Sequence, residues 1–125
     1  MIIINLDDRL LKLTVTGHAT PEEGPDWKLV CNSVSVLAQG LVYSIAKFEE
    51  NHDALLGFDY KIDPGDMIVN PSPEEWARAT IRKRMQIYGD GLQLVAENFP
   101  EYCRMTWNDM EIKAEVTENG DEKKT

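Results

Sequence analysis

The chain has 125 residues, 42% of them apolar, which is enough for the core of one domain and too few for two. Its formal net charge of −9 argues against a nucleic-acid-binding surface, which needs clustered lysines and arginines. An acidic surface instead attracts basic partners. We expect a cytoplasmic protein without membrane contact, because the start MIIINLDDR is unlike a signal peptide and no apolar run approaches about 20 residues.

The first half of the chain is predicted to form a β-hairpin, a loop and a long helix. Residues 2–17 contain a run in which Leu11, Leu13 and Val15 alternate with polar residues, which is typical of a strand. Residues 18–26 include two prolines and a glycine, so we expect a loop. In residues 28–51 apolar residues recur at helical spacing, and others widen the apolar stripe. A second subunit would cover this wide surface, so we expect a homodimer.

The second half is predicted to add another hairpin and another long helix. Residues 55–70 form the hairpin, with the tetrapeptide DPGD as its turn. Ser72 and Glu75 have the spacing of a capping box, which predicts a helix start at that point. Gly89 and Gly91 each weaken this helix by about 1 kcal/mol, so we expect a kink or a break there.

These elements predict a single α+β domain. Residues 101–116 alternate loosely and supply one or two last strands, which gives the order β-β-α-β-β-α-β. This order favours two layers, with both helices on one side of a mainly antiparallel sheet. We expect the domain to span residues 1–117 and a disordered polar tail to occupy residues 118–125.

The loop before the first helix is flanked by residues suited to thiol chemistry. Cys31 is predicted near the helix start, where free N–H groups and the helix dipole favour a thiolate and can hold an oxyanion. His18 ends the preceding strand, so its imidazole can take the thiol proton and later protonate a leaving amine. The pair therefore indicates a cysteine hydrolase. A small buried Cys and a Gly-His turn with structural roles alone fit the same spacing.

Other candidate residues have weaker patterns. A zinc site built from His18, Cys31, His52 and Cys103 is disfavoured, because neither the cysteines nor the histidines are closely paired. We therefore expect no metal and no cofactor. His52 suits the C-terminal end of the first helix, where a cation complements the dipole. Cys103 lies in a strand-like run and is predicted to pack in the core.

The residues around this loop resemble the pattern of the ribosomal-processing cysteine protease (Prp) family. That pattern has a Gly-His-Ala, a loop with Gly and Asp, and a Val-Cys followed by a Ser four residues after the Cys. The matching residues here are Gly17, His18, Ala19, Gly24, Asp26, Val30, Cys31 and Ser35. The stretch GLQLVAENFPEY is also similar to members from Firmicutes and their phages. The resemblance covers nearly the whole chain, although only the first motif is specific.

The resemblance implies a homodimeric endopeptidase with Cys31 as nucleophile and His18 as general base and acid. Its implied substrate is a short, apolar, aromatic-containing N-terminal extension of a large-subunit ribosomal protein, or of a phage capsid or scaffold protein. The family's Asp lies three residues before the Cys, whereas here Lys28 holds that place and Asp26 lies five before. We expect Asp26 to cap the helix and Ser35 to lie on the same helix face as Cys31. The lengthened loop leaves a second hypothesis, a non-catalytic dimeric module that binds the same segment.

Overall fold

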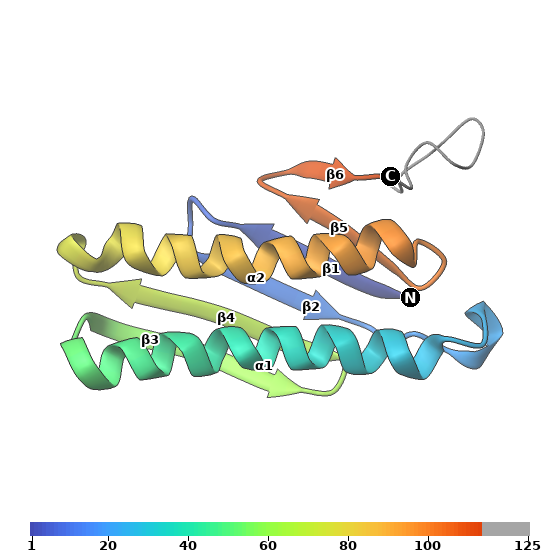
Figure 1. Ribbon diagram of the computed structural model, residues 1–125, viewed down its shortest axis with the longest axis horizontal. Coiled ribbons are helices and arrows are strands. Elements are labelled where there is room, and N and C mark those ends of the chain that lie inside the picture. Colours follow the sequence, from blue (N-terminus) through green and yellow to red (C-terminus); the bar gives the residue numbers. More distant parts are fainter. Residues whose placement is uncertain (114–125) are drawn as a thin grey trace.

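Two helices cover one face of a six-stranded sheet in the computed structural model, which describes residues 1–113 (Figure 1). The elements in chain order are β1 (Ile2–Asp7), β2 (Lys12–Thr16), η1 (Pro21–Glu23), α1 (Trp27–His52), β3 (Leu55–Asp63), β4 (Asp66–Pro73), η2 (Glu75–Ala77), α2 (Arg78–Asn98), β5 (Cys103–Trp107) and β6 (Met110–Ile112). The predicted α+β class and two-layer architecture are confirmed. The expected tail at 118–125, and the end of the expected domain at 114–117, lie outside the described residues.

The sheet is mixed, with the order β3-β4-β2-β1-β5-β6. Four of its pairings are antiparallel, and β1 runs parallel to β5 with Ile2 opposite Cys103. The first strand therefore lies in the interior of the sheet, between β2 and the strand that follows the last helix. The pairing of β2 with β4 places Thr16 opposite Asp66, which brings the β3–β4 turn beside the end of β2.

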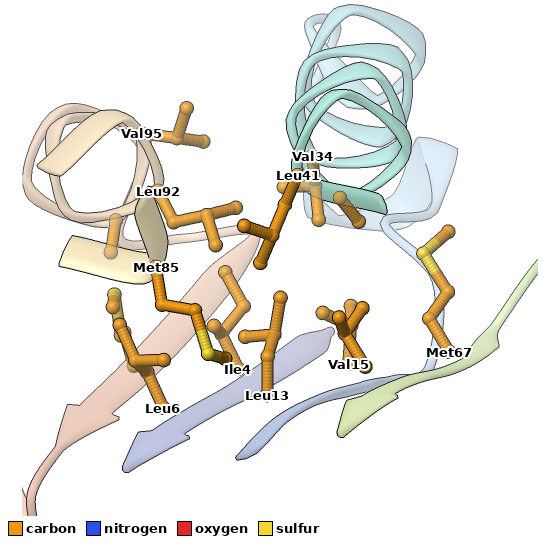
Figure 2. Packing of buried hydrophobic residues seen from close by; sticks show 14 of the residues in the cluster. Ile4, Leu6, Leu13, Val15, Val34, Leu41, Met67, Met85, Leu92 and Val95 are labelled. Carbon is orange, nitrogen blue, oxygen red and sulfur yellow. The ribbon is translucent and has the colours of Figure 1, made fainter. Parts of the chain in front are cut away.

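The core lies between the helices and the sheet. Side chains alternate along each strand, so every second residue of β1 and β2 points toward the helices (Figure 2). Each helix packs an apolar stripe against this face of the sheet. The fully buried residues with the largest side chains are Ile4, Leu11, Leu13, Leu41, Ile45, Ile81, Met85, Leu92 and Met105. Each side chain of this size contributes about 1.5–3 kcal/mol when it leaves water.

The second helix begins later than predicted, and the capping box at Ser72 and Glu75 does not form. Instead β4 continues to Pro73, because it keeps its pairing with β3. The N–H of Glu74 also donates to the segment before β3, at 2.7 Å. One turn of 3₁₀-helix then leads into α2 at Arg78. Long-range strand pairing has thus outweighed a local helix-start signal.

The helix does not break at Gly89 and Gly91, since α2 is continuous from Arg78 to Asn98. Both glycines lie at close contacts. A Cβ at Gly89 would lie 2.5 Å from Cδ2 of Leu6, and one at Gly91 would lie 2.9 Å from Cδ2 of Leu37. The glycines therefore let α2 approach the sheet and α1 closely, and this packing offsets their low helix propensity.

A buried carboxylate joins three elements at the turn after β1. Asp8 is 3% exposed and accepts hydrogen bonds from Nε1 of Trp107 at 2.8 Å and from Nδ2 of Asn108 at 3.2 Å. It also pairs with Arg82 of α2 at 3.1 Å. Burial raises the pKa of Asp8, but the hydrogen bonds from Trp107, Asn108 and Gln86 outweigh it and hold that pKa below its usual value.

One helix, α1, is long and apolar enough to cross a membrane by length and composition. The mean hydropathy of α1 reaches 1.5, because residues 29–46 carry no charge. In the fold, α1 buries Val34, Leu41 and Ile45 in the core, and core helices of this kind meet the same criterion. Only 28% of the apolar stretch is buried inside the domain, so α1 also presents an apolar surface to its surroundings.

Candidate active site

His18 follows the end of β2 and lies over the turn between β3 and β4. Gly17 ends the strand with a φ of +87°, and its N–H donates to the carbonyl of Gly65 at 3.0 Å. A Cβ on Gly65 would lie 2.3 Å from Nε2 of His18, so the imidazole rests directly on this glycine. Gly65 has a φ of +77°, which favours glycine over other residues. The β3–β4 turn thus contacts the imidazole directly and limits where it can lie.

Cys31 is half-buried and is the fifth residue of α1. Its S–H donates to the carbonyl of Ala19 at 3.7 Å. The hydrogen-bond ladder of the helix already begins at Val30, whose N–H donates to the carbonyl of Asp26 at 3.0 Å. Cys31 therefore lies beyond the free N–H groups of the first turn, where the dipole favours a thiolate most strongly. The free N–H groups at the helix start are therefore farther along the chain from Cys31 than the sequence suggested.

His18 and Cys31 line the same cavity, which has a volume of about 200 Å³. Its remaining walls come from β1, β2, α1 and the β3–β4 hairpin, and consist of Ile2, Val15, Gly17, Asn32, Val34, Ser35, Pro64, Gly65 and Met67. Within residues 1–113 the hydrogen-bond partner of the thiol is the Ala19 carbonyl and not the imidazole. The imidazole and the thiol thus share a cavity without a hydrogen bond between them. In cysteine and serine hydrolases such hydrogen bonds are often long until substrate binds.

The loop between the two residues is tied to the start of the chain. The ammonium group of Met1 pairs with Oε2 of Glu23 at 2.6 Å and donates to the carbonyl of His18 at 2.5 Å. The other carboxylate oxygen of Glu23 accepts the N–H of Thr20 at 2.9 Å. Its bond with the ammonium holds the pKa of Glu23 below its usual value. One carboxylate therefore fixes the middle of the loop and the start of β1 together.

Tyr102 fixes the other end of the loop. Its hydroxyl accepts the N–H of Asp26 at 2.9 Å, and a Cβ on Gly24 would lie 2.1 Å from the same oxygen. Asp26 does occupy the N-cap position of α1, but its side chain makes no capping hydrogen bond, so the prediction that it caps the helix is wrong. Its ψ of 17° lies outside the extended conformation that capping side chains usually adopt.

The other sequence-predicted residues are distributed between the site and the rest of the fold. Ser35 lines the cavity one turn after Cys31, and its Oγ accepts a hydrogen bond from Nε2 of Gln39 at 2.8 Å. His52 lies at the far end of α1, with Nδ1 3.0 Å from the carbonyl of Phe48. Cys103 is buried in β5, and burial raises the pKa of its thiol to about 11. The four residues of the disfavoured zinc set are not brought together.

Sequence reasoning missed several residues that shape the site. Gly65 was recognisable as a turn residue, but its contact with His18 depends on the pairing of β2 with β4, which no local pattern encodes. Tyr102 is 76 positions from Asp26, and only the parallel pairing of β1 with β5 brings it beside the loop. Asn32 carried a local signal, since it follows the candidate nucleophile directly.

Solved structures with the same fold include two from S. aureus and one from Streptococcus mutans. The S. aureus ribosomal processing protease Prp with a covalently linked product peptide has a TM-score of 0.63 and 18% identity, covering 86% of this chain and 99% of that one. The same protease with a substrate peptide has a TM-score of 0.62 and 18% identity, covering 85% and 96%. The S. mutans protein SMU.848 has a TM-score of 0.58 and 19% identity, covering 85% and 90%.

These solved structures are only 18–19% identical to the chain, so they show its fold alone. Comparison with models of protein families is more specific. No match was found among curated protein sequences. The family model described as cysteine protease Prp matches residues 1–104, a segment that includes both His18 and Cys31. Because this match covers most of the chain, the protein belongs to the cysteine protease Prp family.

Proposed function

We propose that the protein is a cysteine endopeptidase in which Cys31 is the nucleophile and His18 the general base and acid. The observation that carries the proposal is the shared cavity: His18, in the loop after β2, and Cys31, in α1, line one space. Cys103 offers no alternative nucleophile, because it is buried and its raised pKa keeps it protonated.

The chemistry follows from the two side chains. His18 takes the proton of the Cys31 thiol, and the thiolate sulfur attacks the carbonyl carbon of the scissile peptide bond. The carbonyl π electrons move to oxygen and give a tetrahedral intermediate. When this collapses, the C–N bond breaks and the imidazolium gives its proton to the leaving amine. Water then hydrolyses the thioester and restores the thiol.

The substrate we propose is a short apolar, aromatic-containing N-terminal extension of a bacterial large-subunit ribosomal protein, or of a phage capsid or scaffold protein. The cavity floor is apolar, formed by Ile2, Val15, Val34 and Met67. Its volume of about 200 Å³ is below the roughly 300 Å³ at which small-molecule sites begin, and it suits one side chain of a longer peptide. The net charge of −9 would attract a basic ribosomal protein in the cytoplasm.

We also propose a homodimer formed through the outer surface of the two helices. Val36 and Tyr43 of α1, and Ile87 and Leu94 of α2, are each 59–67% exposed. A hollow of about 670 Å³ lies on the same side, lined by Ser44, Ala79, Thr80, Lys83, Arg84, Ile87 and Tyr88. It is larger than the Cys31 cavity but contains neither cysteine nor histidine, so it suits a contact surface better than a catalytic one. Sedimentation as a monomer at micromolar concentration would exclude the dimer.

The decisive experiment is mass spectrometry of peptides incubated with the protein. One peptide carries the N-terminal extension of a ribosomal protein and the other a phage-type segment. We expect the wild type to cut one of them at a single bond, Cys31→Ala to cut neither, and Cys103→Ala to keep the activity. The preferred peptide would identify the substrate class.

The same experiment tests the alternative, a non-catalytic dimeric module that binds the segment. The observation that favours this alternative is the hydrogen bond of the thiol to Ala19 instead of His18. Saturable binding of a peptide that stays intact with the wild type would support the module and exclude the protease.

A further inference from the structure

The cavity needs a hydrogen-bond donor for the oxyanion, and the helix backbone is poorly placed to supply it. In the proposed reaction, negative charge develops on the carbonyl oxygen next to the Cys31 sulfur. The ladder of α1 begins at Val30, so the free backbone N–H groups belong to the turn before Cys31. A side-chain donor beside the sulfur would therefore matter more here than in a site at the first turn of a helix.

Asn32 is the residue lining this cavity that carries a side-chain amide. It follows Cys31 in α1 and lines the same space as Cys31 and His18. Among residues 1–113 its amide has no hydrogen-bond partner, whereas the neighbouring Ser33 donates to the carbonyl of Leu29 at 2.7 Å. Ser35 also lines the cavity, but its Oγ is engaged by Gln39. The Asn32 amide keeps two N–H donors for a bound group.

We propose that Asn32 is a further catalytic residue, whose Nδ2 donates a hydrogen bond to the oxyanion of the tetrahedral intermediate. This inference rests on the proposed protease function. As the S–C bond forms and the carbonyl π electrons move to oxygen, the oxygen accepts the N–H of Asn32. When the C–N bond breaks, the electron pair returns to the carbonyl and this hydrogen bond weakens. No proton leaves the amide.

The donor acts on the intermediate more than on the bound substrate, so its loss should appear in kcat. Removing one oxyanion donor typically lowers kcat about 10²–10³-fold. We expect Asn32→Ala to lower kcat by this factor with KM unchanged. Alanine is a strong helix former and Asn32 is exposed, so the variant should fold. Asn32→Asp keeps the shape of the side chain but replaces the donor by a carboxylate, and we expect at least the same loss.

Two controls separate donation from other effects. Asn51→Ala makes the same change at the far end of α1, and we expect wild-type kcat. Alkylation of Cys31 by iodoacetamide forms no oxyanion, so its rate should be the same in Asn32→Ala and the wild type. A parallel loss of alkylation and cleavage would show that Asn32 acts on the thiol itself, and would overturn the oxyanion role.

The remaining outcomes also decide the question. If the wild type cleaves the peptide and Asn32→Ala or Asn32→Asp cleaves equally fast, the oxyanion role is wrong while the protease stands. If the wild type forms neither product nor thioester, the proposed function fails and this inference fails with it. A loss confined to KM would assign Asn32 to substrate binding instead.

Discussion

Replacing Gly65 by alanine tests whether the β3–β4 turn positions His18, the proposed general base. The new Cβ would lie 2.3 Å from Nε2 of His18, whereas ordinary contacts of a Cβ begin at 3.4 Å. The imidazole must therefore move by about 1 Å, and a misplacement of that size can cost about 10²-fold in rate. Because Gly65 has a φ of +77°, the alanine also adds a backbone cost of about 1–2 kcal/mol.

We expect Gly65→Ala to lower kcat/KM for peptide cleavage about 10²-fold and the free energy of unfolding in urea by about 1–2 kcal/mol. The matched control is Gly57→Ala in the same hairpin, where no heavy atom lies within 4 Å of the new Cβ. It should leave kcat/KM unchanged. A folded Gly65→Ala variant with wild-type kcat/KM would refute the reasoning, because His18 would then act equally well after its imidazole is displaced from Gly65.

Three further outcomes are expected. Tyr102→Phe removes the acceptor of the Asp26 N–H and should lower the free energy of unfolding by about 1 kcal/mol, measured in urea; an unchanged value would mean that water replaces the hydroxyl. Iodoacetamide should label Cys31 well before Cys103, whose pKa is raised to about 11; mass spectrometry showing equal rates would contradict this. The lowered pKa of Asp8 stabilises the fold above pH ~4, and this contribution is lost as the pH falls through the folded-state pKa. Asp8→Asn should therefore be less stable at neutral pH but lose less stability as the pH falls below about 4; an acid profile identical to that of the wild type would count against this.

The parts of the fold that were predictable are those set by local periodicity. The alternation through Leu13 and Val15 gave β2 correctly, and the apolar spacing of residues 28–51 gave α1 to within one residue at each end. The DPGD turn was also correct, because Pro64 and Gly65 fix its backbone by their own chemistry.

The errors arose where distant segments compete with local signals. Ser72 and Glu75 have helix-start spacing, but the edge of β3 pairs with the same segment and keeps it extended. Asp26 has the residue type of a cap, yet its ψ of 17° is not the extended conformation of a capping residue, and its side chain makes no capping bond. The sequence predicted that His18 and Cys31 lie on either side of one loop. It did not predict the rest of the cavity wall, because that depends on which strands lie beside β2 in the sheet.

The parallel pairing of β1 with β5 makes assembly of the site depend on nearly the whole chain. Ile2, in the wall of the cavity, is paired with Cys103, about a hundred positions later in the chain. The loop is held at Asp26 by Tyr102, which lies 76 positions later. During synthesis, His18 and Cys31 emerge from the ribosome long before the strand that completes their surroundings. The nascent chain therefore carries the residues of a protease without its cavity, and the activity should arise only once synthesis has passed β5.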